Sequence, residues 1–164
     1  MKPTLKEEIT MTDIAQKLDE LGIVLPDSVP PLFNYVPFVV TGNLVFIAGQ
    51  VPIGGENEYK GQVCEAITIE QGKRAARRCA INILAQVRDA VDGDWSRVVR
   101  CVKLGGFVSC KPDFSDQSEV INGASDLIVD VMGDAGRHAR FAVGAPSLPA
   151  NFSVEVDAVF EIDV

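Results

Sequence analysis

The order of hydrophobic and polar positions predicts amphipathic helices separated by strands. The first helix is short, because Ile14, Leu18 and Leu21 recur at the spacing of a single helix face. Thr12 can cap its beginning and Gly22 can end it. Four prolines follow within about a dozen residues, and they favour an extended connector because proline lacks a backbone N–H donor.

Two longer helices are predicted further along the chain. The segment Thr68–Gln71 has the spacing of a capping box and begins a helix over about residues 69–91. A third helix is predicted over about residues 117–132, where apolar residues again recur on one face and Gly133 follows. The arginines of the second helix, Arg74, Arg77 and Arg78, are interpreted as a solvated face.

Five segments have the composition of strands: residues 36–40, 44–51, 97–109, 139–143 and 151–162. The first two flank a short Thr-Gly-Asn turn and are predicted to form a hairpin. The third contains two adjacent glycines, Gly105 and Gly106, which indicate a bulge. In the last segment, apolar residues alternate with a second set that includes Glu155, so one side faces a core and the other carries carboxylates.

The order of these elements predicts an α+β fold in which helices cover one face of a mixed sheet. At 164 residues the chain fits a single domain. Residues 1–31 would form an N-terminal extension, made of the first helix and the proline-rich connector, and residues 32–164 would form the core domain.

Composition removes several classes of function. The formal net charge is -8, and an acidic surface repels nucleic acid. The N-terminus is too polar for a signal peptide, and no apolar run approaches the roughly 20 residues that span a bilayer, so we expect a cytoplasmic protein. The four cysteines form no metal-type spacing and are interpreted as reduced structural thiols, with Cys79 and Cys101 buried. No nucleotide-binding motif is present, and we expect no metal or organic cofactor.

Two charged residues stand out as candidate chemistry. Arg140 lies in an apolar strand, where a guanidinium is costly to bury unless an anion meets it. It can pair structurally with Glu155 or Asp157 of the neighbouring segment, or it can bind a ligand carboxylate. Glu155 can be simply solvent-exposed, or it can position a water and relay a proton. His138, the single histidine, is interpreted as an exposed loop residue.

Three segments of the chain, read together, resemble the RidA/YjgF family, also called the L-PSP endoribonuclease family. The first runs from Asn34-Tyr35-Val36 through Gly42 to Pro52, and the second is Asp113-Phe114 with Val120-Ile121-Asn122. The third is Ala139-Arg140, then Leu148-Pro149, then Val154-Glu155-Val156-Asp157. The resemblance covers roughly residues 33–162.

The resemblance implies a chorismate-mutase-like subunit in a homotrimer, with clefts between subunits. It implies hydrolysis of reactive enamine/imine intermediates, such as 2-aminoacrylate, to 2-keto acids and ammonia. Arg140 would hold the ligand carboxylate and Glu155 would orient water. Tyr35 and Asn122 would line the same cleft, with Tyr35 contributed across the interface.

The chain departs from the family pattern at three cleft positions. Ala48 replaces a serine, Phe141 replaces a serine or threonine, and Ala142 replaces a residue that is often cysteine. These changes leave the physiological substrate open. The rival hypotheses are a non-catalytic trimer that binds small carboxylates or keto acids, an endoribonuclease, and a purely structural role in which Arg140 and Glu155 neutralise each other at the trimer interface.

Overall fold

The structure is a computed structural model that describes residues 13–28, 31, 33–54 and 59–164. Its helices are α1 (Ile14–Glu20), α2 (Ile69–Ala90) and α3 (Gln117–Met132). Its strands are β1 (Phe38–Thr41), β2 (Leu44–Gln50), β3 (Val98–Ser109), β4 (Ala139–Ala145) and β5 (Val154–Ile162). Short 3-10 turns occupy Trp95–Arg97, Gly133–Gly136 and Pro149–Asn151.

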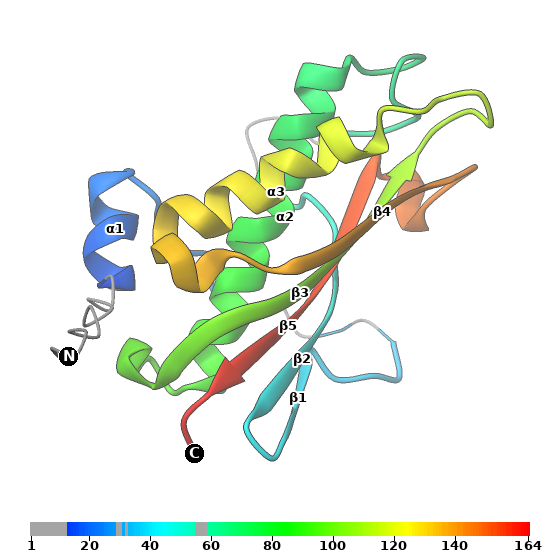
Figure 1. Cartoon of the computed structure of the whole chain (residues 1–164). Helices are drawn as coiled ribbons and strands as arrows, with labels where there is room; N and C mark the ends of the chain where they lie inside the picture. The colour runs from blue at the N-terminus through cyan, green and yellow to red at the C-terminus, as the bar shows by residue number, and fades with distance from the viewer. Residues whose placement is uncertain (1–12, 29–30, 32, 55–58) are drawn as a thin grey trace, which may run out of the picture.

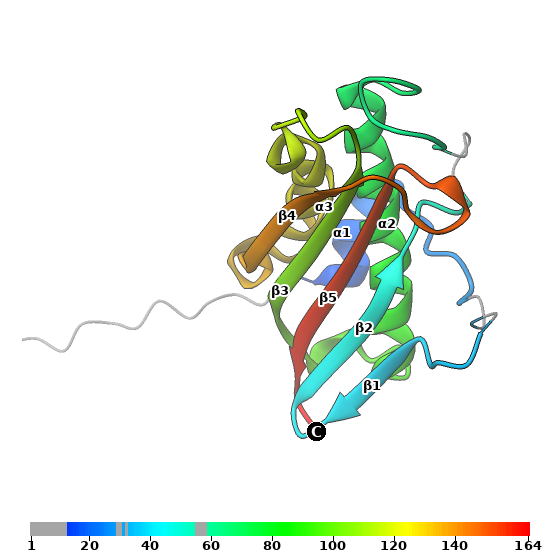
Figure 2. The same ribbon diagram turned by 90° about the vertical axis from the view of Figure 1, so that its right-hand side faces the viewer.

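The five strands form one mixed sheet in the order β1-β2-β5-β3-β4 (Figure 1). Neighbouring strands are antiparallel except β3 and β4, which are parallel and are connected through α3. All the helices lie on one side of this sheet, as the view in Figure 2 shows. The predicted α+β architecture is therefore confirmed. The division at residue 31 into extension and core stays a prediction.

Local sequence determines where the helices begin. Thr68 and Gln71 form the predicted capping box: the Gln71 backbone N–H donates to Thr68 Oγ1 at 3.1 Å, and the Thr68 N–H donates to Gln71 Oε1 at 2.8 Å. For α1 the described cap is Asp13, whose carboxylate accepts from the backbone N–H of Gln16. The predicted cap, Thr12, lies outside the described residues.

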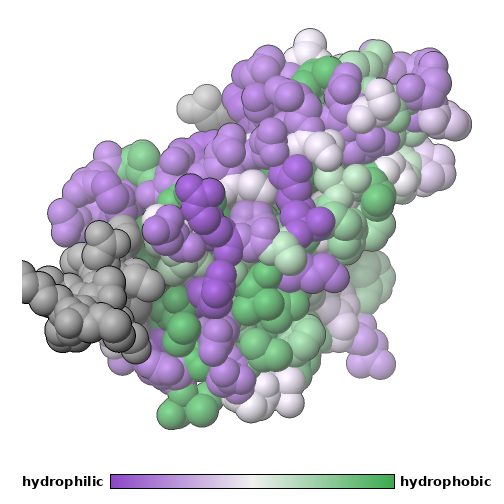
Figure 3. All heavy atoms as spheres, in the orientation of Figure 1, coloured by the Kyte–Doolittle hydropathy of each residue, from purple (hydrophilic) through white to green (hydrophobic). Residues whose placement is uncertain are grey.

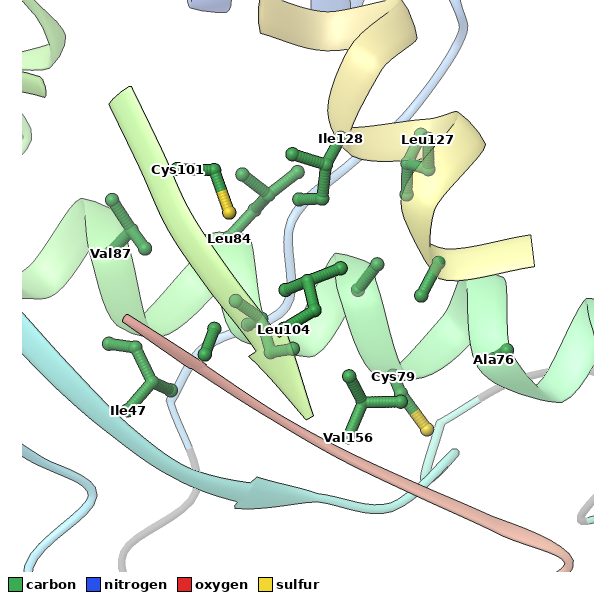
Figure 4. Close-up of a cluster of buried hydrophobic side chains, with 14 of the residues drawn as sticks. Ile47, Ala76, Cys79, Leu84, Val87, Cys101, Leu104, Leu127, Ile128 and Val156 are labelled. Carbon is green, nitrogen blue, oxygen red and sulfur yellow. The ribbon is translucent and has the colours of Figure 1, made fainter. Parts of the chain in front are cut away.

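The core lies between the sheet and the pair of helices α2 and α3. Leu84 of α2, Ile128 of α3 and Leu104 of β3 are each fully buried there (Figure 4). Val156 of β5 points into the same cluster, and burying each such side chain contributes about 1.5–3 kcal/mol. This packing fixes the position of α3 over β3 and β4, which matters for the site described below.

The other face of the sheet carries no helix and is unusually apolar. Cross-strand register places Val39 and Phe46 on this face at one edge, and Phe107 and Val143 toward the other. These four side chains are 38–51% exposed. Hydrophobic surface also gathers over the strands in the lower half of Figure 3, whereas hydrophilic surface covers the helices. We call this helix-free side the open face.

Two sequence expectations about the strands are corrected. The bulge expected at Gly105 and Gly106 is absent, because both residues pair regularly with β5. Register shifts lie instead between Ile47 and Gln50 of β2 and near the beginning of β3. The glycines serve close packing: a β-carbon on Gly106 would overlap the side chain of Ile121. The last strand also begins at Val154 rather than residue 151, because a 3-10 turn precedes it.

Two cysteines behave as the small buried hydrophobes that the sequence predicts. Cys79 and Cys101 have no exposed surface. Burial raises the pKa of the Cys79 thiol well above its usual range and that of Cys101 to about 12, so both stay protonated and unreactive. Within the described residues, no helix combines the length and apolar character needed to cross a membrane.

Candidate functional site

Arg140 is anchored to helix α3 by neutral groups. Its Nη1 donates to Asn122 Oδ1 at 2.9 Å and to Ser125 Oγ at 3.0 Å. Its Nη2 donates to the backbone carbonyl of Ser118 at 3.3 Å. Asn122 and Ser125 are three residues apart on α3, so they lie on one helix face above the edge strand β4. The structure thus brings Arg140 and Asn122 together and holds the guanidinium in a fixed orientation.

The interpretation that Arg140 pairs with Glu155 or Asp157 of the same chain is wrong. Strand β3 lies between β4 and β5, so the two segments are not neighbours. Arg140 also bonds on the helix side, whereas Asp157 is in register with Gly105 and Phe141 on the open face. Across the described ranges, no carboxylate lies within ion-pair distance of Arg140. Within the described residues, its charge is therefore uncompensated.

His138 is half-buried rather than exposed, and it connects to Arg140 through a shared hydroxyl. The Gly136 carbonyl can only accept, so it fixes the proton of a neutral His138 on Nδ1 and leaves Nε2 to accept from the Ser125 hydroxyl, 2.9 Å away, whose oxygen also accepts from Arg140. His138 Nδ1 then carries the proton and donates to the carbonyl of Gly136 at 2.6 Å. Burial, and secondly the charge of Arg140, lower the pKa of His138 against the opposing effect of the Gly136 hydrogen bond. A neutral histidine thus supports the orientation of Ser125.

Glu155 lies on the open face at the centre of the sheet. Burial, and secondly the charge of Asp157, raise its pKa above the ordinary value for a glutamate. A β-carbon on Gly49 of β2 would overlap the carboxylate of Glu155, so only glycine allows this side chain its position. A half-buried carboxylate with a raised pKa can exchange a proton closer to neutral pH.

Tyr35 lies apart from both Arg140 and Glu155. It precedes β1, which is the opposite edge of the sheet from β4, and it is 52% exposed. It lines a cavity that Gly49 also lines, so it lies on the same side of the molecule as the segment beside Glu155. One chain therefore holds the four predicted residues in two groups: Arg140 with Asn122 at one edge, and Glu155 and Tyr35 toward the other.

Comparison with known proteins assigns this chain to a family. The model of the family described as "YjgF/chorismate mutase-like, putative endoribonuclease" matches residues 15–162. The chain belongs to this YjgF family.

Its relatives in the YjgF family differ in how closely they resemble it. Protein TCP17 of Trypanosoma cruzi is 45% identical over 154 residues, covering 92% of this chain and 94% of its own. The structure of Atu1372 from Agrobacterium tumefaciens is 50% identical with a TM-score of 0.84, covering 92% of each chain. RidA from Psychrobacter is 25% identical with a TM-score of 0.54. The match covers 84% of this chain and 96% of that RidA. This chain is therefore longer than that RidA and is folded more like Atu1372.

Sequence reasoning missed two residues near Arg140. They are Ser125, whose hydroxyl accepts from the guanidinium, and His138, which hydrogen-bonds to that hydroxyl. Ser125 had a usable signal, since it follows Asn122 by three residues on a predicted helix. His138 had a weaker one, because its glycine-rich neighbourhood resembled a solvated loop. Phe141, which departs from the family pattern, points to the open face, where its ring centroid lies 5.4 Å from that of Phe107. That departure therefore adds apolar surface away from the Arg140 guanidinium.

Proposed function

We propose that the protein hydrolyses reactive enamine/imine intermediates that carry a carboxylate, releasing 2-keto acids and ammonia. The observation that carries this proposal is the uncompensated guanidinium of Arg140, which is fixed by neutral partners. A charge held in this way is available to an anionic ligand, and its planar donors suit a carboxylate.

The site that we propose forms between copies of the chain. Arg140 and Glu155 are on opposite sides of one sheet, so one chain alone offers a ligand only one of them. The apolar open face supports association, because a surface of this kind gains free energy when a second copy covers it. A homotrimer, the assembly implied by the resemblance, would place the Arg140 edge of one chain beside the Glu155 and Tyr35 side of the next.

The chemistry requires little beyond orientation and proton transfer. With the substrate carboxylate on Arg140, a water attacks the imine carbon while Glu155 accepts one of its protons. Glu155 returns this proton to nitrogen to give a carbinolamine, and then transfers the hydroxyl proton to the same nitrogen. As the carbon–nitrogen bond breaks, the carbonyl of the keto acid forms and ammonia leaves. The raised pKa of Glu155 suits both steps, and such acid–base assistance is worth about 10² to 10⁴ in rate. None of these steps calls for a metal or an organic cofactor.

The test is keto-acid release from freshly generated 2-aminoacrylate and from imines with larger side chains. We expect the wild type to accelerate release, and Arg140→Ala and Glu155→Gln to abolish the acceleration. Arg137→Ala is the matched control, since Arg137 is an exposed arginine three residues earlier.

Two outcomes would decide against the enzyme. If the wild type matches the uncatalysed rate over all side chains but binds pyruvate through Arg140, the protein is a small-acid binder. If it cleaves single-stranded RNA instead, the activity in the family description applies. In either case the deaminase proposal fails.

A further inference from the structure

A cavity of about 340 Å³ lies between helix α2, the end of β2 and the segment that precedes β1. Its walls come from α2, from the end of β2, from the proline-rich connector and from the segment at Pro149–Phe152. The volume is within the range of sites that hold small molecules. Arg140, Asn122 and Glu155 do not line it.

Three polar residues of α2 line the cavity in a single row. Arg78, Asn82 and Gln86 follow one another at intervals of four residues, so they share one face of the helix. Arg78, interpreted from the sequence as part of a solvated face, therefore also lines a cavity. Arg78 Nε donates to the carbonyl of Ile53 at 2.8 Å, and Asn82 Nδ2 donates to the carbonyl of Val51 at 2.9 Å. These bonds attach α2 to the chain beyond β2 and fix the row in place.

Gln86 is the observation that points to a ligand. Its side chain is 4% exposed, and its Oε1 has no hydrogen-bond partner among the described residues. A buried amide oxygen without a partner costs about 1–3 kcal/mol, so the free protein maintains it at a loss. A hydroxyl group of a ligand would satisfy this amide, because a hydroxyl both donates and accepts.

Arg78 supplies the opposite end of the site. Its Nη1 and Nη2 make no hydrogen bond or ion pair with any described residue, whereas its Nε is occupied by Ile53. Arg78 and Gln86 are two helical turns apart, a rise of about 12 Å. The lining also includes apolar residues, among them Phe33, Pro149 and Phe152.

Two hydrogen bonds hold the connector against the helix that carries this row. Arg88 Nη2 donates to the carbonyl of Pro26 at 3.1 Å, and the Ser28 hydroxyl donates to the carboxylate of Asp89. Both contacts join the connector to the last turns of α2, next to Gln86. The cavity is therefore built by packing of the N-terminal extension on α2.

We propose that this cavity binds a small carboxylic acid with an apolar body and a hydroxyl at the far end. The carboxylate pairs with the terminal nitrogens of Arg78, the body packs on the apolar walls, and the hydroxyl bonds to the amide of Gln86. The contacts proposed here use neither Arg140 nor Glu155, although Tyr35, a residue of the proposed catalytic cleft, also lines this cavity.

The test is isothermal titration of the full-length protein with 3-(4-hydroxyphenyl)propanoate. We expect saturable binding with a dissociation constant below about 1 mM. Gln86→Leu and Arg78→Met should each weaken binding at least about tenfold, since each removes a buried or charged hydrogen bond. Arg74→Met is the matched control, because Arg74 is exposed on the same helix outside the cavity, and it should bind as the wild type does.

Analogues of the acid test the two ends without altering the protein. 3-Phenylpropanoate lacks the hydroxyl, so it should bind more weakly to the wild type and be insensitive to Gln86→Leu. 3-(4-Hydroxyphenyl)propan-1-ol lacks the charge, so it should be insensitive to Arg78→Met. The proposal is overturned if the acid gives no saturable heat, or if both variants bind it as tightly as the wild type. Binding that survives in Arg140→Ala would also separate this site from the proposed catalytic one.

Discussion

The Ser125 hydroxyl can donate to His138 only while the histidine is neutral. It accepts from Arg140 and donates to His138 Nε2. Protonation would place a second N–H on Nε2, facing an oxygen that already accepts, and would add a positive charge near the guanidinium. The pKa of His138 is lowered, first by burial, so the unfolded chain takes up this proton at a higher pH than the folded one.

The sign of the pH effect follows. The stability that neutral His138 contributes is fully present above the ordinary histidine pKa of about 6.5. It is lost as the pH falls from there toward the lower pKa of His138 in the folded protein. Because the chain has one histidine, its proton NMR ring resonance reports this titration directly. We expect an apparent pKa below 6.5 in the folded protein and a smaller decline of unfolding free energy between pH 7 and 5.5 in His138→Gln. A titration at or above 6.5 would contradict the buried neutral state.

Gly49 ties the shape of β2 to the carboxylate of Glu155. A β-carbon at position 49 would overlap the end of the Glu155 side chain, which can swing away at little cost. We expect Gly49→Ala to leave the free energy of unfolding unchanged or raise it by about 0.5–1 kcal/mol, because alanine suits a strand better than glycine. Keto-acid release should nonetheless fall at least tenfold. Unfolding in urea, run beside the kinetic assay, would separate the two effects, and full activity in this variant would remove Glu155 from the mechanism.

At the scale of elements, the crossing of α2 and α3 determines where Asn122 and Ser125 lie. Gly123 is at this crossing, and a β-carbon there would overlap the backbone carbonyl of Lys73. Backbone cannot swing aside as a side chain does, so we expect Gly123→Ala to destabilise the fold by about 1–3 kcal/mol. Asp126→Ala is the control, since Asp126 is exposed on the same helix. Equal urea midpoints for Gly123→Ala and Asp126→Ala would show that α2 and α3 can move apart at this crossing without loss of stability.

The helices were the elements that local sequence predicted best. The capping box at Thr68 and the apolar stripe of α3 are local signals, and the structure confirms both. The bulge expected at Gly105 is absent. Glycine is needed there because a β-carbon would overlap the side chains of Asp157 and Phe141, which are distant in sequence. Strand order could not be predicted, because hydrophobic alternation does not show that β3 separates β4 from β5. The hypothesis of an Arg140–Glu155 pair within one chain had assumed that these two strands are neighbours.

At the scale of the whole molecule, the open face should be covered by other copies of the chain. Phe46 is 46% exposed and lies in register with Val39 and Val159 toward the β1 edge of this face. We expect Phe46→Asp to leave a folded monomer without deaminase activity, because a buried carboxylate at an apolar interface is strongly unfavourable. Val24→Asp, a control at an 88% exposed residue of the connector, should keep the wild-type mass by light scattering. A wild type that is itself monomeric would contradict the proposed assembly.

Mixing two inactive variants tests whether the catalytic site joins neighbouring chains. Arg140→Ala keeps Glu155, and Glu155→Gln keeps Arg140, and the structure places these residues on opposite sides of one sheet. If each site takes its arginine from one copy and its glutamate from the next, random trimers from an equal mixture contain intact sites at about a quarter of positions. Co-expression of the two variants should therefore recover about a quarter of wild-type activity, while each alone recovers none. No recovery in trimers shown to be mixed would mean that both groups serve the same chain, which the sheet order makes hard to reconcile with a shared substrate.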